Sequence, residues 1–195
     1  MAVPAPKFSL DDFLAWENAQ DTRHEFYGSQ VFAMTGARRV HALVGGNVYA
    51  ALRLHLKGTR CRAFYEGMKV QLADDAVFYP DVFVTCDEAD LKTEMVFRRP
   101  SLVVEVLSPS TQAFDRGLKF SAYRQLASLR EYVLIDPDSR NVEVFRRNER
   151  DNFELIDQSR QPELVLDSVG LHLAMAEVFD GVNDSAQGSV DSLPA

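Results

Sequence analysis

The sequence predicts a single α/β domain, and two observations lead to that fold class. The first is the order of elements: a helical pattern opens the chain, short apolar strands follow, and a helical segment separates two of the later strands. This order is typical of a mixed central β-sheet flanked by helices. The second is the length of 195 residues, which favours one domain with a substantial core.

The N-terminal part predicts a helix and a hairpin behind a flexible arm formed by residues 1–8. Ser9 followed by Asp12 is a variant of the capping box, a pattern that opens a short helix. Two strands around a Gly28-Ser29 turn then predict a hairpin. The expected strands are His24–Tyr27 and Gln30–Thr35.

A long helix is expected over about Val40–Leu56, and Gly58 is a suitable residue to end it. Gly45-Gly46 lies inside this helix, where each glycine costs roughly 1 kcal/mol relative to alanine. The pair therefore predicts either close packing against a neighbour or a local break in the helix.

The rest of the chain predicts short strands bounded by turn residues, with one helix between them and a second near the end. The strands are expected at Cys61–Tyr65, Met68–Leu72, Phe78–Thr85, Leu102–Leu107, Glu131–Ile135, Val142–Phe145 and Phe153–Ile156, with turns at Asp74-Asp75 and Pro137-Asp138. The helices are expected over about Ala113–Leu126 and Leu173–Phe179. Residues 181–195 are small and polar and predict a disordered tail, so the domain is expected to span residues 9–180.

The net charge of −8 is unevenly distributed along the chain. Residues 1–150 carry 20 basic and 20 acidic side chains, whereas residues 151–195 carry one basic residue, Arg160, and nine acidic ones. The part expected to carry the chemistry is therefore balanced, and strong non-specific binding of DNA through charge alone is not predicted.

The sequence shows neither a transmembrane run nor a signal peptide, so no membrane association is expected. Cys61 and Cys86 are isolated and form no Cys-x-x-Cys pair, which argues against a structural zinc site or a disulfide framework. A reducing, cytoplasmic location fits this cysteine usage.

An acidic residue, Glu105, interrupts a strand that is otherwise apolar, Leu102–Leu107. Such a run predicts a strand buried on both faces. An ionised carboxylate there costs several kcal/mol or more unless it is neutralised, paired or bound to a metal. Asp81 occupies a similar apolar setting after Pro80, so the two carboxylates together suggest a divalent-metal site.

Four segments in order resemble the Uma-type family of putative restriction endonucleases, within the PD-(D/E)XK nuclease superfamily. They are Arg23-His24-Glu25 with Gly28, FYPDVFVTCD, LVVEVLSPST and DRGLKFSAYRQLASLREYVLID. The resemblance covers roughly residues 8–180 and implies a restriction-endonuclease-like domain. It also implies a Mg²⁺-dependent endonuclease acting on DNA, with Mn²⁺ as a substitute for Mg²⁺.

The resemblance also implies roles for individual residues. Asp81 and Glu105 would hold the metal together with the backbone carbonyl of Val106, and Glu25 would be an accessory acid. Hard oxygen ligands of this kind suit Mg²⁺, which neutralises phosphate charge and activates water.

The chain departs from the superfamily pattern at Leu107, where a lysine is expected two residues after the glutamate. In relatives with this departure the lysine lies on the following helix, so the resemblance implies Lys119, which shares one face of the expected helix with Asp115 and Tyr123. Lys119 is favoured because a base must first reach the reacting water. Lys69 is the alternative. Asp115 and Lys119 could also be no more than an exposed ion pair worth about 0.3–0.5 kcal/mol.

Further contacts to a phosphate or a water are expected from residues beside this site. Ser110, in the loop after the Glu105 strand, could bind a phosphate, although a helix N-cap role for Ser110 or Thr111 is equally compatible. His41 lies near the start of the long helix and could face the site. Lys69 is a further candidate for such a contact.

The favoured hypothesis is a metal-dependent endonuclease that cleaves DNA, acting as a homodimer or higher homo-oligomer. Motifs of serine hydrolases, of P-loop nucleotide binders and of His-Glu-x-x-His metalloenzymes are absent from the sequence. One alternative is an inactive nuclease-fold module that binds nucleic acid or a protein. Another is an interaction protein whose acidic tail binds a partner.

Overall fold

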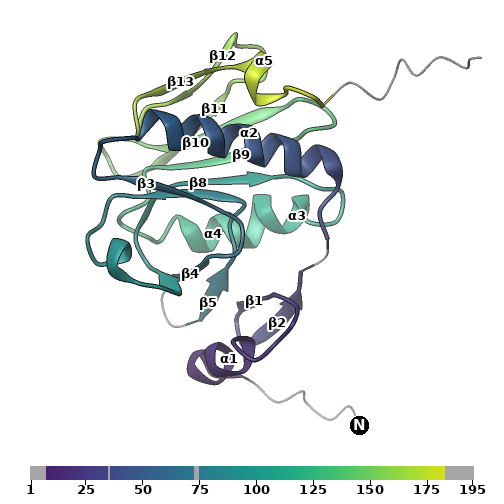
Figure 1. Cartoon of the computed structure of the whole chain (residues 1–195), viewed down its shortest axis with the longest axis vertical. Helices are drawn as coiled ribbons and strands as arrows, with labels where there is room; N and C mark the ends of the chain where they lie inside the picture. The colour runs from purple at the N-terminus through teal and green to yellow at the C-terminus, as the bar shows by residue number, and fades with distance from the viewer. Residues whose placement is uncertain (1–7, 35, 73–74, 183–195) are drawn as a thin grey trace, which may run out of the picture.

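A six-stranded mixed sheet in the order β11-β10-β9-β8-β6-β3 forms the larger layer of the structure (Figure 1). The structure is a computed structural model that describes residues 8–34, 36–72 and 75–182. The strands of this sheet are β3 (Arg62–Tyr65), β6 (Val82–Thr85), β8 (Pro100–Val106), β9 (Glu131–Ile135), β10 (Val142–Arg147) and β11 (Phe153–Asp157). Strands β8 and β9 pair in parallel, whereas β6 pairs antiparallel with β8.

Helices cover both faces of this sheet, as the apolar sequence of β8 predicts (Figure 1). Helix α2 (Arg39–His55) lies on one face, where Val44 and Val48 pack in the same core as Val104. The connection from β8 to β9 lies on the other face. It consists of α3 (Gln112–Phe114), the π-helical turn η2 (Asp115–Lys119) and α4 (Phe120–Tyr123).

The glycine pair in α2 is explained by close packing and not by a break, because the helix is continuous. A Cβ atom on Gly45 would lie 3.0 Å from the ring of Tyr65, whereas Gly46 has open space around it. Gly45 therefore lets α2 approach β3.

A five-stranded sheet in the order β2-β1-β5-β4-β7 forms the second layer. Its strands are β1 (His24–Tyr27), β2 (Gln30–Ala33), β4 (Lys69–Leu72), β5 (Ala76–Phe78) and β7 (Val96–Phe97). The predicted hairpin is confirmed as β1 and β2. The N-terminal helix α1 (Leu10–Glu17) packs Phe13 on Phe26 of β1, with ring centroids 4.9 Å apart.

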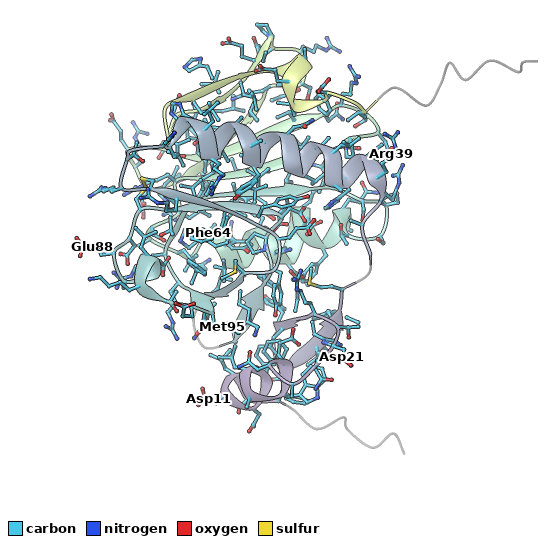
Figure 2. The ribbon with its side chains drawn as sticks, in the orientation of Figure 1. Asp11, Asp21, Arg39, Phe64, Glu88 and Met95 are labelled. Atoms are coloured by element: carbon cyan, nitrogen blue, oxygen red, sulfur yellow. A yellow bond between two sulfur atoms is a disulfide. The ribbon has the colours of Figure 1, made fainter. Side chains whose placement is uncertain are left out.

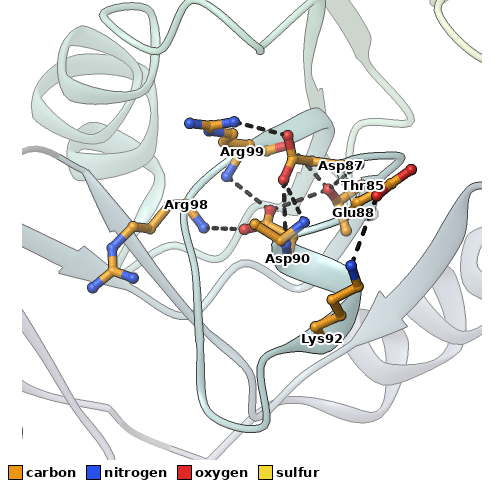
Figure 3. A network of polar contacts seen from close by, with 8 residues as sticks. Thr85, Asp87, Glu88, Asp90, Lys92, Arg98 and Arg99 are labelled. Atoms are coloured by element: carbon orange, nitrogen blue, oxygen red, sulfur yellow. Dashed lines mark hydrogen bonds and ion pairs between the residues drawn. The ribbon is translucent and has the colours of Figure 1, made fainter.

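Aromatic side chains join the two sheets. Phe64 on β3 stacks on Phe83 at 5.1 Å and contacts Phe97 of the five-stranded sheet at 4.6 Å (Figure 2). The connection between β6 and β7 is also anchored by a buried acid. Asp90, in the short helix η1 (Asp90–Lys92), accepts hydrogen bonds from the Thr85 hydroxyl and from two backbone N–H groups of the chain that leads out of β7 (Figure 3).

The prediction of one strand over Phe78–Thr85 was wrong. The chain leaves the five-stranded sheet after Phe78, crosses through Tyr79–Asp81 and enters the six-stranded sheet at Val82. Pro80 has no N–H group and cannot continue a ladder of hydrogen bonds. Asp81 therefore sits at the junction of the two sheets.

The prediction of a last helix over Leu173–Phe179 was wrong in its first half. Residues Leu171–Ala174 form β13, which pairs with β12 (Glu163–Leu166), and the helix α5 is confined to Met175–Val178. The alternating burial of Leu171 and Leu173 explains the strand. The expected arm up to residue 7, most of the expected tail and Asp74 of the expected turn lie outside the described residues.

The expectation that the two cysteines are isolated was wrong as well. The register of β3 and β6 pairs Arg62 with Thr85, which brings Cys61 and Cys86 face to face, and they form a disulfide. The cysteines are 25 residues apart in the sequence, and no local pattern indicates that they pair. The cysteines therefore no longer support a reducing compartment. Across the described residues, no helix is long and apolar enough to cross a membrane.

The disulfide predicts a measurable contribution to stability. In the chain-entropy model, closing a loop with the sequence separation of 25 contributes about 3–4 kcal/mol. We expect the double variant Cys61→Ser and Cys86→Ser to unfold at a lower urea concentration than the wild-type protein, by a free energy of this order. Titration of free thiols in unfolded protein, purified without reductant, provides the check. Two free thiols per chain would contradict the pairing.

Candidate active site

Three acidic side chains from different elements converge on one buried ammonium group, that of Lys119 in η2. Its Nζ atom lies 2.9 Å from Oε1 of Glu25 on β1 and 3.0 Å from Oε1 of Glu105 on β8. Oδ1 of Asp115, one turn earlier in η2, lies 3.7 Å away. The four side chains are at most 10% exposed, so this cluster is an interior one.

Asp81 joins this cluster from the junction of the two sheets. The antiparallel register of β6 and β8 pairs Val82 with Val104. Asp81, the residue before Val82, therefore lies opposite Glu105. Oδ2 of Asp81 accepts a hydrogen bond of 2.7 Å from the backbone N–H of Val106. The ring of His41, in the first turn of α2, places Nε2 3.2 Å from the same oxygen.

Glu25 is held from two sides. Its Oε1 atom contacts Lys119 and also accepts a hydrogen bond of 3.0 Å from the backbone N–H of Tyr79. The predicted accessory acid is therefore attached both to the residue before Pro80 and to the lysine. The N-terminal hairpin is thereby tied to the centre of the protein.

The π-helical turn determines where Lys119 points. Asp115 and Lys119 share one side of this turn, as their spacing predicts, and the Tyr132 hydroxyl donates a 3.0 Å hydrogen bond to the carbonyl of Asp115. The ammonium also lies 5.6 Å from the centre of the Phe78 ring. The alternative of an exposed Asp115–Lys119 pair is wrong, because both side chains are buried.

Burial and mutual proximity shift the pKa values of these groups. Burial raises the pKa of Glu105 well above its usual value, and the nearby acids raise it further, although Lys119 opposes this shift. Burial likewise raises the pKa of Asp115. For Lys119, burial favours the neutral amine, but Glu105, Glu25 and Asp115 outweigh it and raise the pKa well above its usual value. Lys119 is therefore cationic at neutral pH.

His41 follows the same logic at the edge of the cluster. Burial favours the neutral ring, whereas the hydrogen bond to Asp81 and the charge of Asp81 outweigh burial and raise the pKa. The prediction that His41 faces this region is matched by its contact with Asp81.

Neither Lys69 nor Ser110 forms a hydrogen bond or an ion pair with the carboxylates of Glu25, Asp81, Glu105 or Asp115 among the described residues. The Nζ atom of Lys69 donates a 2.5 Å hydrogen bond to Oδ1 of Asn18, at the end of α1. Ser110 is exposed and its hydroxyl contacts Ser108. Thr111 is the N-cap residue of α3, as one of the two expectations had it, but its side chain makes no capping hydrogen bond. Its backbone N–H donates a hydrogen bond to the Ser108 hydroxyl.

Two residues of the cluster were not among the expected site residues. Asp115 carried a usable signal, because it lies four residues before Lys119 on a helical segment. Tyr79 carried none, because its contribution is a backbone N–H that any residue except proline supplies. Tyr123, whose spacing matched Lys119, is fully buried, and its hydroxyl has no hydrogen-bond partner among the described residues.

The donor set is compatible with a Mg²⁺ ion at this place. No group of three or more metal-ligating side chains is found in the described part of the chain. The side-chain ligands that the resemblance implies are the two carboxylates of Asp81 and Glu105. Mg²⁺ is commonly held by one or two carboxylates, with water and substrate phosphate completing its shell. The carboxylates of Glu105, Glu25 and Asp115 lie next to the single ammonium of Lys119, and that of Asp81 lies next to His41.

The fold and this arrangement are those of a nuclease-like protein. The family model described as "Uma2: Putative restriction endonuclease" matches residues 10–176, and the chain belongs to that family. The predicted resemblance is confirmed, and so is the predicted mixed α/β architecture.

Known proteins are similar to this chain in sequence or in structure. An uncharacterized protein of Synechocystis sp. (strain ATCC 27184 / PCC 6803 / Kazusa) is 33% identical over 182 residues, which is 93% of this chain and 96% of that protein. A second uncharacterized protein of the same organism is 31% identical over 139 residues, 70% of this chain and 78% of that protein. The crystal structure of a putative nuclease of the DUF820 group from Anabaena variabilis ATCC 29413 shares the fold. Its TM-score is 0.74 at 21% identity, covering 90% of this chain and 99% of that one.

The buried cluster predicts how a variant without the ammonium would behave. We expect Lys119→Met to lower the free energy of unfolding by about 3–5 kcal/mol at pH 8, because it leaves buried carboxylates without their cation. The loss should shrink toward pH 5. Lys119 lowers the pKa of Glu105, so its removal raises this pKa further. The folded variant then keeps a proton that the unfolded chain has released, and its stability falls more steeply than that of the wild-type protein as pH rises.

Urea unfolding at both pH values measures this dependence. The double variant Lys119→Met with Glu105→Gln is the matched control, because it removes the buried charge together with its partner. Equal losses for Lys119→Met at pH 5 and pH 8 would contradict the electrostatic interpretation.

Proposed function

We propose that this protein is a divalent-metal-dependent endonuclease that hydrolyses phosphodiester bonds in DNA. The observation that carries the proposal is the carboxylate of Glu105, buried in a central strand, with Lys119 at 3.0 Å and Asp81 directly before the neighbouring strand β6. Two acids and a lysine in one cluster are the groups that phosphodiester hydrolysis requires. Membership of the Uma2 family supports a nuclease role.

Asp81 and Glu105 would hold the metal, Mg²⁺ with Mn²⁺ as a substitute, and the carbonyl of Val106 would be a further ligand. Such an ion, when bound, neutralises phosphate charge and makes a water more acidic. Asp81 suits this role, because Oδ2 is engaged by Val106 and His41 while Oδ1 has no hydrogen-bond partner among the described residues. The two contacts on Oδ2 keep the carboxylate in a fixed orientation.

Lys119 would act as a cation and not as a base, because its raised pKa keeps it protonated at neutral pH. Its ammonium is positioned to attract the attacking water and to stabilise the negative charge that develops on the phosphate in the transition state. Glu25 would hold the ammonium in place, since Glu25 is itself fixed by the N–H of Tyr79.

The alternative of an inactive nuclease-fold module rests on the missing lysine at position 107 and on the balanced charge of residues 1–150. That alternative would be favoured if Lys69 and Lys119 both pointed away from the acids. Lys119 contacts Glu105 and Glu25, which favours the catalytic proposal. A homo-oligomer would allow two such sites to act on both strands of a duplex.

The proposal predicts metal-dependent cleavage of DNA. Single-stranded, duplex and branched DNA are incubated with the full chain in Mg²⁺ or Mn²⁺, and we expect cutting that stops when the metal is chelated. Asp81→Ala and Glu105→Gln should each lower the rate by about a hundredfold or more, in the range that a positioned catalytic group contributes.

Arg160→Gln is the matched control, because Arg160 is exposed in a turn far along the chain from the cluster. It should leave the rate unchanged. Equal cutting by the wild-type protein and Asp81→Ala would mean that the activity comes from elsewhere. No cutting of any substrate with either metal would favour the inactive module, and parallel reactions on RNA would reveal a different substrate.

A further inference from the structure

A cavity of about 240 Å³ lies beside the candidate active site. None of the acids around Lys119, nor Lys119 itself, lines this cavity. Its walls come from the end of α1, from the chain that leads into β1 and from the start of β4. Met95, which is labelled in Figure 2, also lines it. Tyr79 belongs to both places. Its ring lines the cavity, while its backbone N–H binds Glu25 of the active site.

Two cationic side chains line this cavity with few partners of their own. Lys69 is 5% exposed, and Asn18 is its hydrogen-bond partner among the described residues, although an ammonium carries three N–H donors. The guanidinium of Arg23 lies 5.9 Å from the centre of the Tyr79 ring. It has no hydrogen bond or ion pair within the part of the chain that the structure describes.

Gly67 makes room for the guanidinium. Its φ of +75° is a conformation that glycine adopts at little cost, and a Cβ atom there would lie 2.8 Å from Nη2 of Arg23. The backbone of this turn and the side chain of Arg23 are therefore adjacent. Any larger residue at position 67 would push the guanidinium away from the cavity.

Among the described residues, the acids of the cavity form no ion pair with these cations, although burial lowers the pKa of Lys69 and the charge of Glu17 opposes this shift. Both oxygens of Glu17 are engaged, because they accept hydrogen bonds from the backbone N–H of His24, from its ring and from the Tyr79 hydroxyl. Glu94 is exposed. The cavity therefore offers N–H donors on Lys69 and Arg23 to an oxyanion.

We infer that Lys69 and Arg23, with Asn18 beside them, form a phosphate-binding subsite separate from the hydrolytic centre. The ligand is a phosphate group of the nucleic-acid backbone, and this part of the inference rests on the proposed function. Arginine and lysine are the usual partners of backbone phosphates, and such contacts position a substrate without specifying its sequence.

The position of the subsite supports a backbone phosphate over an unrelated anion. Gly67 directly follows Glu66, whose N–H donates a 2.9 Å hydrogen bond to the carbonyl of Asp81. The cavity is therefore linked to Asp81 through this turn and to Glu25 through Tyr79. On this assignment Lys69 binds a phosphate other than the one that is cleaved, which makes Lys69 a positioning residue for the cleavage reaction.

The anion-binding part of the inference is tested with inorganic phosphate added to the full, isotope-labelled chain. We expect NMR shifts at the amides of Asn18, Gly67 and Lys69 that saturate with phosphate. Lys69→Met and Arg23→Gln should each weaken phosphate binding about tenfold or more, as expected for a lost hydrogen bond between charged groups. Lys57→Met is the matched control, because Lys57 lies beyond the C-terminal end of α2. It should leave binding unchanged.

The backbone part is tested with DNA. Lys69→Met should raise KM, leave kcat within about twofold and reduce the slope of log KM against log salt by about one phosphate contact. Arg23→Gln, at an exposed position, should do the same and guards against a folding defect in Lys69→Met. Lys57→Met should match the wild-type protein in KM and slope.

The NMR measurement tests the anion-binding subsite, and the DNA measurement tests its assignment to a backbone phosphate. The absence of phosphate-dependent shifts at these amides would overturn the subsite. Shifts that the variants abolish, together with unchanged DNA slopes, would overturn the backbone assignment and leave a site for free phosphate. If the wild-type protein cuts no nucleic acid, the proposed function fails, while the NMR measurement still decides whether the anion site exists.

Discussion

The buried ammonium of Lys119 is the group around which the candidate site is arranged. It contacts carboxylates from the N-terminal hairpin, from the central strand β8 and from its own π-helical turn. A carboxylate in a central strand that is closed on both sides by helices would otherwise stay protonated or disfavour folding. One cation thus lets Glu105 occupy the interior and at the same time ties the N-terminal hairpin to the six-stranded sheet.

Two buried glutamates on neighbouring strands, Glu131 on β9 and Glu105 on β8, differ in how their carboxylates are paired. Glu131 on β9 is fully buried, but its two oxygens accept hydrogen bonds from Arg146 and from the backbone N–H groups of Asp167 and Ser168. Both of its oxygens are hydrogen-bonded, and these bonds fasten the β12–β13 hairpin to the main sheet. Glu105 instead shares a single lysine with two other acids, and Asp81 adds further negative charge. Acids that share one buried cation are weak evidence for a stabilising role, and perturbed pKa values of this kind are typical of functional sites.

The sequence predicted the parts of this site that depend on local patterns. The apolar run around Glu105 indicated a strand buried on both sides, and the spacing of Asp115 and Lys119 indicated a shared helical side. Contacts set by long-range pairing were not predictable in the same way. The Cys61–Cys86 disulfide depends on the register of two strands, and the hydrogen bond from Tyr79 to Glu25 uses the backbone, which leaves no trace in residue identity. The break at Pro80 was missed because its flanking residues suit either sheet.

The geometry also explains how Lys119 can contact Glu105 although position 107 is occupied by leucine. Residues two apart along a strand project to the same side, so a lysine at 107 would lie on the side that carries Glu105. That side is covered by the connection from β8 to β9, and Leu107 is buried there in the same core cluster as Tyr123 of α4. Because η2 belongs to this covering segment, Lys119 approaches Glu105 from above the same side of the sheet. The ammonium can therefore reach Glu105 from the covering segment, while the apolar Leu107 fills the core.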